Sequence, residues 1–303
     1  MLRTFLLYLS ERETPKKLLT RHSWGRRLAQ RFIAGEELAD ALGVVRQLNQ
    51  DGFEVTLDYL GEAVHEPAAA EEACRAYIEI LDHLAQDGLR SHISVKPTQL
   101  GLAIDESLTV RLLRSVCERA WLHHTFVRID MESSAYVDAT LRVFRALEAP
   151  RDSLGVVIQS YLYRSEKDVD ELLKEGAYIR LVKGAYKEPP DVAFPRKKDV
   201  DRSFQKLMET MLASGLYHAM ATHDERLIGL AIEYARAHKL GPERFEFQML
   251  YGIRRRLQRD LLKQGWRVRV YVPFGRQWYA YFMRRLAERP ANLFFLMRNF
   301  FRQ

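Results

Sequence analysis

From Glu54 onward the chain alternates between two hydrophobic patterns. Short runs rich in β-branched and aromatic residues predict strands, and the longer stretches between them, with apolar residues three and four apart, predict amphipathic helices. Strict alternation of the two predicts parallel strands joined by right-handed crossovers. The eight predicted strands are Glu54–Leu60, His92–Thr98, Phe126–Met131, Gly155–Tyr161, Tyr178–Gly184, Tyr217–His223, Phe245–Leu250 and Arg267–Phe274.

The helical pattern is clearest in four of the stretches between these strands. Eight strand–helix units in roughly 230 residues match a closed barrel better than an open, doubly wound sheet. No G-x-G-x-x-G follows the first strand, which weighs against a dinucleotide-binding fold. The sequence therefore predicts an α/β protein with a distorted (β/α)8 barrel of the TIM type over residues 51–303. The four predicted helices are Ala73–Asp87, Asp168–Glu175, Arg202–Ser214 and Glu225–Ala237.

Residues 1–50 have a helical pattern without strands. Leu2, Phe5 and Leu9 share one helix face, and a second helical pattern runs from about Trp24 to Asn49. We expect this N-terminal segment to pack on the barrel as extra helices.

Positive charge is concentrated in the last part of the chain. The net charge is +7, but residues 254–303 hold 13 Lys and Arg against the two acids Asp260 and Glu288. This bias suggests an anionic partner: a phosphorylated cofactor, a carboxylate substrate or an acidic membrane surface.

Two cysteines, Cys74 and Cys117, are too few for a disulfide scaffold or a zinc cluster and fit a reducing compartment. No apolar run is long enough to cross a bilayer. We expect a cytoplasmic protein without a metal, in contact with the inner face of the membrane at most peripherally.

Polar or titratable residues stand at nearly every predicted strand end. In a barrel of this kind the loops that follow the strands converge on one rim, where active sites are built. Any one of these residues alone could be a helix cap or a solvated side chain, but together they favour a catalytic rim. They are Asp58, Tyr59, Lys96, Asp130, Glu132, Gln159, Lys183, Tyr186, Thr222, His223, Asp224, Gln248 and Tyr271.

A predicted helix after the last strand adds two adjacent arginines. Tyr281, Arg284, Arg285 and Glu288 are spaced three and four apart and share one face. A guanidinium is a planar fork that binds a carboxylate through two hydrogen bonds. A surface helix with incidental charges explains the spacing about equally well.

Ordered segments at these strand ends resemble the proline dehydrogenase family, including the dehydrogenase domain of bifunctional proline-catabolic enzymes. The resemblance spans about Glu54 to Phe300, and Pro97, which follows the first of these segments, predicts that its strand ends or kinks there. The matching segments are Ile93–Lys96, Arg128–Glu132, Val157–Tyr161, Arg180–Tyr186, Ala221–His223, Phe245–Leu250, Tyr271–Gly275 and Tyr281–Glu288.

This resemblance implies FAD bound non-covalently over the strand ends. Positive charge near the flavin suits it, because reduction places negative charge on the ring system. The residues expected at the cofactor are Gln159, Arg180, Lys183, Gly184, Ala185, Tyr186, Thr222, His223 and Glu288.

The resemblance also implies L-proline as substrate, oxidised to Δ1-pyrroline-5-carboxylate by hydride transfer to flavin N5 in the first step of proline catabolism. Arg284, Arg285 and Lys96 would bind the carboxylate, while Leu250, Tyr271, Tyr281 and the Ala185–Tyr186 pair would enclose the ring. Asp130 would lie near the amine or support Lys96, and Glu288 would brace the arginine helix; Lys96, Asp130 and Tyr271 are the expected catalytic residues. Electrons would pass to membrane quinone, with the basic C-terminal region against anionic lipid.

Two other interpretations remain open at this stage. Lys96 or Lys183 on a barrel strand could form a Schiff base, as in an aldolase. The basic C-terminal region could instead belong to a membrane- or nucleic-acid-binding module. The second interpretation leaves the polar rim unexplained, and the sequence has no nucleic-acid-binding motif.

Overall fold

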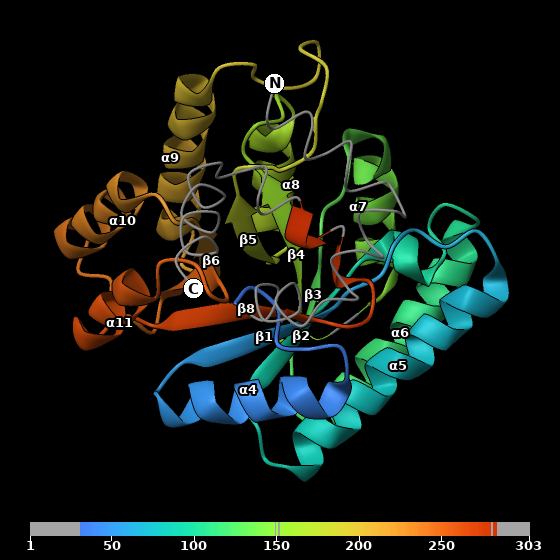
Figure 1. The fold of residues 1–303 in the computed structure, drawn as a ribbon. Coiled ribbons are helices and arrows are strands. Elements are labelled where there is room, and N and C mark those ends of the chain that lie inside the picture. Colours follow the sequence, from blue (N-terminus) through green and yellow to red (C-terminus); the bar gives the residue numbers. More distant parts are fainter. Residues whose placement is uncertain (1–30, 149, 151, 280, 284–303) are drawn as a thin grey trace, which may run out of the picture.

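Eight parallel strands close into a barrel in sequence order, with β8 paired to β1 (Figure 1). The computed structural model describes residues 31–148, 150, 152–279 and 281–283. All eight predicted strands are present, and the predicted barrel is confirmed. The strands are β1 Glu54–Tyr59, β2 Ser91–Val95, β3 Val127–Ile129, β4 Leu154–Gln159, β5 Tyr178–Val182, β6 His218–Ala221, β7 Phe245–Leu250 and β8 Val268–Phe274.

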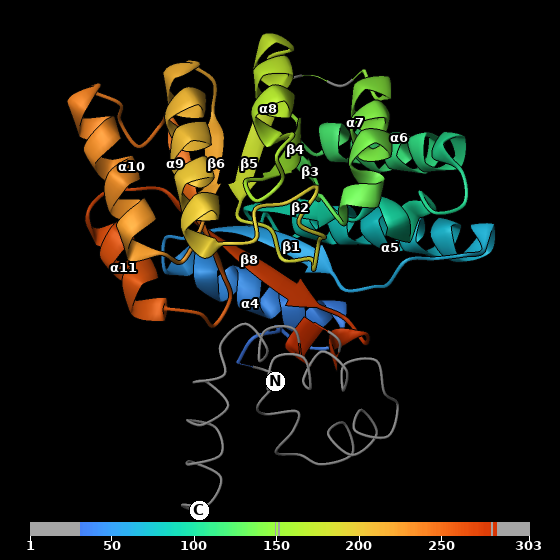
Figure 2. The same cartoon turned by 90° about the horizontal axis from the view of Figure 1, so that it is seen from above.

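Helices follow the first seven strands in turn and pack around the barrel (Figure 2). Their apolar faces are buried while their polar faces remain in solvent, which is why the spacing of three and four identified them. They are α5 Pro67–Gln86, α6 Glu106–Leu122, α7 Val137–Ala146, α8 Ser165–Lys174, α9 Lys197–Ala213, α10 Glu225–Ala237 and α11 Arg255–Lys263, with short 3-10 helices at Pro97–Leu100 and Ser134–Tyr136.

The helix predicted from Trp24 to Asn49 is shorter in the structure. Helix α4 covers Leu38–Gln50 and packs against β1 and β8 through Ala41, Leu42 and Val45. Residues 31–37 form turns and loop instead, because the Ala34 N–H donates to the Pro273 carbonyl at 2.9 Å and the backbone turns at Gly35. The predictions for residues 1–30 lie outside the described residues.

Parallel strands covered by helices are buried on both faces. Strand β4 shows this pattern, since all six of its residues are buried. Strand β2 ends at Val95, and Pro97 begins a 3-10 helix. The strand therefore ends near Pro97, as predicted from the sequence. Several predicted strands ran two or three residues too far at their C-terminal ends, where the chain has already entered the loops of the rim. None of the helices within the described residues is long and apolar enough to cross a membrane.

Candidate active site

A cavity of about 740 Å³ opens at the C-terminal ends of the strands. Every residue that the family resemblance assigned to substrate or cofactor within the described part of the chain lines it, although they come from seven strands or strand ends and from the segment after β8. Tyr59, one of the polar strand-end residues, does not line it and packs against Tyr77 and Phe274 instead. The predicted convergence on one rim is therefore what the fold produces. The assigned residues that line the cavity are Lys96, Asp130, Gln159, Arg180, Lys183, Gly184, Ala185, Tyr186, Thr222, His223, Leu250, Tyr271 and Tyr281.

Lys96, just after β2, is held by Asp58 on β1. The Lys96 ammonium donates to Oδ1 of Asp58, whose side chain is 2% exposed. Burial opposes the charge on Lys96, but the carboxylates of Asp58 and Asp130 outweigh it and raise the pKa of Lys96 above its ordinary value. Lys96 is therefore a protonated cation at neutral pH.

Asp130 joins two other strands instead of supporting Lys96 by a hydrogen bond. Its Oδ1 accepts from Nη1 of Arg180 at 2.8 Å, and its Oδ2 accepts from the Tyr271 hydroxyl at 2.7 Å. Burial, and then the charge of Asp130, raises the pKa of Tyr271 well above its ordinary value, so the phenol stays protonated as a donor. Asp130 acts on Lys96 only through its charge, while Asp58 makes the direct bond.

Lys183, at the end of β5, lies between two carboxylates. Its Nζ is 2.6 Å from Oδ1 of Asp201 on α9 and 2.9 Å from Oδ2 of Asp224. Burial opposes ionisation of Asp224, but the hydrogen bond from Lys183 leads the effects that lower the pKa of Asp224 to about 2. Asp224 also caps α10, because its Oδ1 accepts from the Arg226 N–H.

Two buried polar atoms next to the cavity have no hydrogen-bond partner. Gln159 Nε2 donates to the carbonyls of Met131 and Glu132, which leaves its Oε1 unpaired. Arg180 uses Nη1 for Asp130 and for Ser94 at 2.9 Å, which leaves its Nε unpaired. Both atoms belong to residues that line the cavity, where a bound polar ligand could supply the partner.

The remaining candidates also line the cavity. His223 Nε2 accepts from the Leu250 N–H at 2.9 Å, and Thr222 Oγ1 accepts from the Asp224 N–H. Tyr281 is buried, whereas Tyr186 is 41% exposed at the rim. Leu250 and Tyr281 add apolar surface to a cavity that is otherwise lined by many charged groups.

The adjacent arginines Arg284 and Arg285 and the bracing Glu288 lie outside the described residues. Residues 278, 279 and 281–283, which precede them, are helical as predicted. The sequence did not identify Asp201 as part of the site, because it lies within α9 and not at the end of a strand. Asp201 lies just before the predicted helix Arg202–Ser214, and its one signal is a spacing of three from Phe204, which α9 buries.

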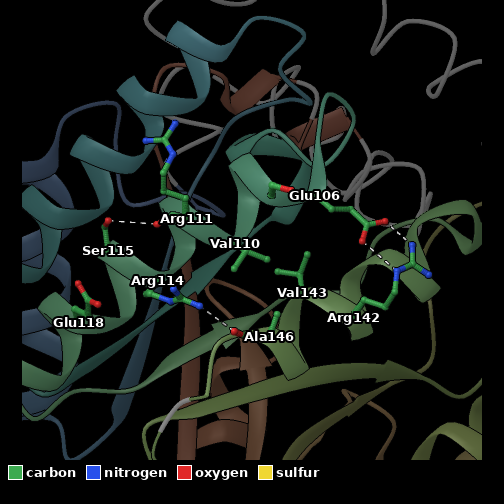
Figure 3. A pocket seen from close by; sticks show the side chains of 10 residues that line it. Glu106, Val110, Arg111, Arg114, Ser115, Glu118, Arg142, Val143 and Ala146 are labelled. Atoms are coloured by element: carbon green, nitrogen blue, oxygen red, sulfur yellow. Dashed lines mark hydrogen bonds and ion pairs between the residues drawn. The ribbon is translucent and has the colours of Figure 1, made fainter.

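A second depression, of about 650 Å³, lies on the outside of the barrel between α6 and α7 (Figure 3). Its arginines already have partners within the protein. Arg142 pairs with Glu106, Arg114 donates to the Ala146 carbonyl and Arg111 pairs with Glu71. The depression also holds no strand end, so it is not the candidate active site.

The lysines of the rim weigh against Schiff-base chemistry. An amine must lose its proton before it can attack a carbonyl. Lys96 has a raised pKa next to Asp58, and Lys183 pairs with two carboxylates. Within the described residues no group of His, Cys, Asp or Glu is arranged to hold a metal ion.

Known proteins with similar sequences are proline dehydrogenases. The chain is 42% identical to Proline dehydrogenase 2 of Bacillus subtilis over 294 residues, which are 97% of this chain and 96% of that protein. It is 41% identical to Proline dehydrogenase of Deinococcus radiodurans over 300 residues, with 97% and 96% covered.

A solved structure with a similar fold is that of proline utilization A from Bdellovibrio bacteriovorus inactivated by N-propargylglycine. The TM-score is 0.82 at 27% identity, and the match covers 86% of this chain and 32% of that one. This chain therefore spans about a third of that larger protein. The family model described as proline dehydrogenase matches residues 41–298. With this match and the near full-length relatives, the chain belongs to the proline dehydrogenase family.

Proposed function

We propose that this protein oxidises L-proline to Δ1-pyrroline-5-carboxylate with a bound FAD, the first step of proline catabolism. One observation carries the proposal: every described residue that the family resemblance assigns to substrate or cofactor lines a single cavity at the strand ends. The relatives named proline dehydrogenase, at 41–42% identity over nearly the whole chain, support the same reaction.

The cavity suits a flavin in chemistry and in size. Its volume of about 740 Å³ lies in the usual range for small-molecule and cofactor sites. The unpaired Gln159 Oε1 can accept a hydrogen bond from a ring N–H, and the unpaired Arg180 Nε can donate one to a ring nitrogen or carbonyl. Arg180 and Lys183 are cationic donors beside the cavity, and each is paired with at least one carboxylate. When bound, the flavin supplies the hydride acceptor.

The chain's own residues would bind and orient proline. Lys96 is protonated, so it would contact the substrate carboxylate as a cation and would not remove a proton from the substrate amine. Leu250, Tyr271 and Tyr281 would enclose the pyrrolidine ring, which has no polar group besides the amine and the carboxylate. Arg284 and Arg285, outside the described residues, would complete the carboxylate clamp.

The direct test is the colour of the purified protein. We expect a yellow protein that releases FAD on denaturation and bleaches when L-proline is added without oxygen. D-Proline is the matched control, because the same ring then presents its carboxylate on the wrong side, and bleaching should be slower. A colourless protein that takes up no FAD, or one that L-proline does not reduce, would contradict the proposal.

The carboxylate clamp has its own test. Arg284→Met should raise the KM for proline at least tenfold, since one arm of the clamp is lost. FAD content should stay at the wild-type level. An unchanged KM would remove Arg284 from the substrate site.

Membrane quinone is the proposed electron acceptor, with the protein in the cytoplasm and bound peripherally to anionic lipid. The exposed arginines of α11 supply positive charge on the described part of the C-terminal region. Replacing Arg255, Arg256 and Arg259 by Glu should slow quinone reduction with anionic vesicles and spare the reduction of a water-soluble acceptor. Equal rates with vesicles before and after charge reversal would contradict lipid contact through α11.

A further inference from the structure

The loop between β5 and α9, residues 183–196, forms one side of the cavity. It leaves β5 and returns to α9 past the ends of the neighbouring strands (Figure 2). Ala185 and Tyr186, in its first half, line the cavity and are exposed. A loop of this length needs fixed points if its wall residues are to hold one position.

The far half of the loop is fastened to the loop after β4. Leu162 and Ala193 form an antiparallel bridge, and the Phe194 N–H donates to the Tyr161 carbonyl at 2.8 Å. The Tyr163 ring packs edge-on against Phe194, with centroids 4.6 Å apart. These contacts hold residues 190–194 in place. The first half of the loop is held by other contacts.

Glu188 attaches the first half. Its Oε1 accepts from the Ser134 N–H at 2.8 Å, and its Oε2 accepts from the Ser134 hydroxyl. Ser134 begins the short 3-10 helix that precedes α7, in the loop after β3. The Glu188 carboxylate therefore joins the loop after β5 to a loop two strands away around the rim.

Tyr161 carries this attachment toward the cavity wall. Its hydroxyl lies 3.4 Å from Oε1 of Glu188 and also interacts with the backbone of Tyr186. Its ring meets Gly184 so closely that a Cβ there would lie 2.4 Å from a ring carbon. Ser134, Glu188 and Tyr161 thus form a continuous set of contacts that ends at Gly184 and Tyr186.

We propose that Glu188 is a positioning residue that latches the β5–α9 loop to Ser134 and so fixes the Ala185–Tyr186 wall of the substrate cavity. Glu188 does not line the cavity and would act through the loop alone. The inference rests on the proposed function for its effect on proline, while its effect on the loop does not depend on the substrate.

The first readout is tryptic cleavage of the purified protein without proline. Lys187 and Arg196 lie in the loop and are exposed. In Glu188→Ala the loop opens more often, and proteolysis follows the population of the open form. Cleavage at Lys187 should be at least about fivefold faster than in Glu188→Gln, which removes the same negative charge beside the scissile bond but can still bond Ser134. Asp191→Ala, an exposed acid of the same loop, is the control and should cleave at the wild-type rate.

The second readout is steady-state kinetics. Glu188→Ala should raise the KM for proline about fivefold to tenfold and change kcat less than about twofold, as expected when a binding wall loosens and the reacting groups stay in place. Glu188→Gln should recover most of the loss, because its amide can accept from the Ser134 N–H and donate to the Ser134 hydroxyl.

Ser134→Ala provides a second variant that removes only one of the two hydrogen bonds. It should change cleavage and KM in the same direction by a smaller factor, which keeps the test decisive if Glu188→Ala does not fold. Wild-type cleavage and wild-type KM in folded Glu188→Ala or Ser134→Ala would overturn the latch. If the wild-type protein fails to oxidise proline, the proposed function fails, and cleavage alone decides the latch.

Discussion

The Tyr271 hydroxyl on β8 donates to Oδ2 of Asp130, just after β3, at 2.7 Å. The two residues are 141 positions apart in the chain and three strands apart around the barrel. Asp130 binds Arg180 of β5 through its other oxygen, so one carboxylate joins three strands at the cavity. The position of each partner then depends on the other two.

Tyr271→Phe tests this bond with little change in shape. Loss of one buried hydrogen bond to a charged group costs about 1.5–3 kcal/mol of the free energy of unfolding. Because the bond also positions Asp130 and, through it, Arg180 at the cavity, kcat/KM for proline should fall by about tenfold. Tyr217→Phe is the matched control, because its hydroxyl bonds the buried Glu246 at 3.0 Å and lies away from the cavity. Equal rates of proline oxidation by Tyr271→Phe and Tyr217→Phe would show that the Tyr271 hydroxyl has no part in the reaction.

The Lys96–Asp58 pair predicts a rescue of stability without a rescue of activity. Asp58→Asn leaves a poorly exposed lysine without its partner, and breaking a buried pair costs about 3–5 kcal/mol. Adding Lys96→Met should return most of the free energy of unfolding, since the remaining charge is then gone. Chemical denaturation measures the free energy of unfolding of both variants. Proline oxidation should stay low in the double variant, and wild-type activity there would contradict a role for Lys96 in substrate binding.

Gly184→Ala should weaken FAD binding and distort the wall of the cavity. The backbone at Gly184 has a φ of +107°, and an added Cβ would lie 2.4 Å from the Tyr161 ring. We expect FAD content after purification to fall to less than about half, with a lower melting temperature. Gly229→Ala, in α10 with open space around it, is the control and should be neutral or stabilising by about 0.5–1 kcal/mol.

His218 makes stability depend on pH. It is fully buried, its Nδ1 accepts from the Ile179 N–H at 3.1 Å, and burial lowers its pKa from an ordinary 6.5 to about 3. Between these values the unfolded chain binds the proton and the folded chain does not, so stability is full above pH 6.5 and falls as the pH drops. From pH 7 to pH 5 this residue should remove about 2 kcal/mol of the free energy of unfolding.

Denaturant unfolding at several pH values tests the effect of His218. His218→Gln should reduce the dependence below pH 6.5 without abolishing it, because one group that takes up a proton is gone while His92, whose pKa burial also lowers, remains. The exposed His238, at the end of α10, serves as the control, and its replacement by Gln should leave the slope unchanged. If the free energy of unfolding of His218→Gln changed with pH as in the wild type, the pH dependence would come from other groups.

The strands and most helices follow from local pattern. The run Phe245–Leu250 reads as a buried strand and forms β7 with the same bounds, and Glu225–Ala237 forms α10 as predicted. Both are set by residues that are neighbours in the chain. Bounds were wrong where tertiary contacts intervene, as before α4, where the backbone at Ala34 is bonded to Pro273.

The order of polar residues at the strand ends determined where the site would lie, because parallel strands that alternate with helices all end on the same side. Which charges pair was decided by the tertiary structure alone. Lys96 bonds Asp58, not Asp130, and Lys183 bonds Asp201 of α9. The reason is geometric. The stagger between strands and the placement of the helices determine which side chains lie within 3 Å of one another, and the spacing of residues along one strand does not predict either of them.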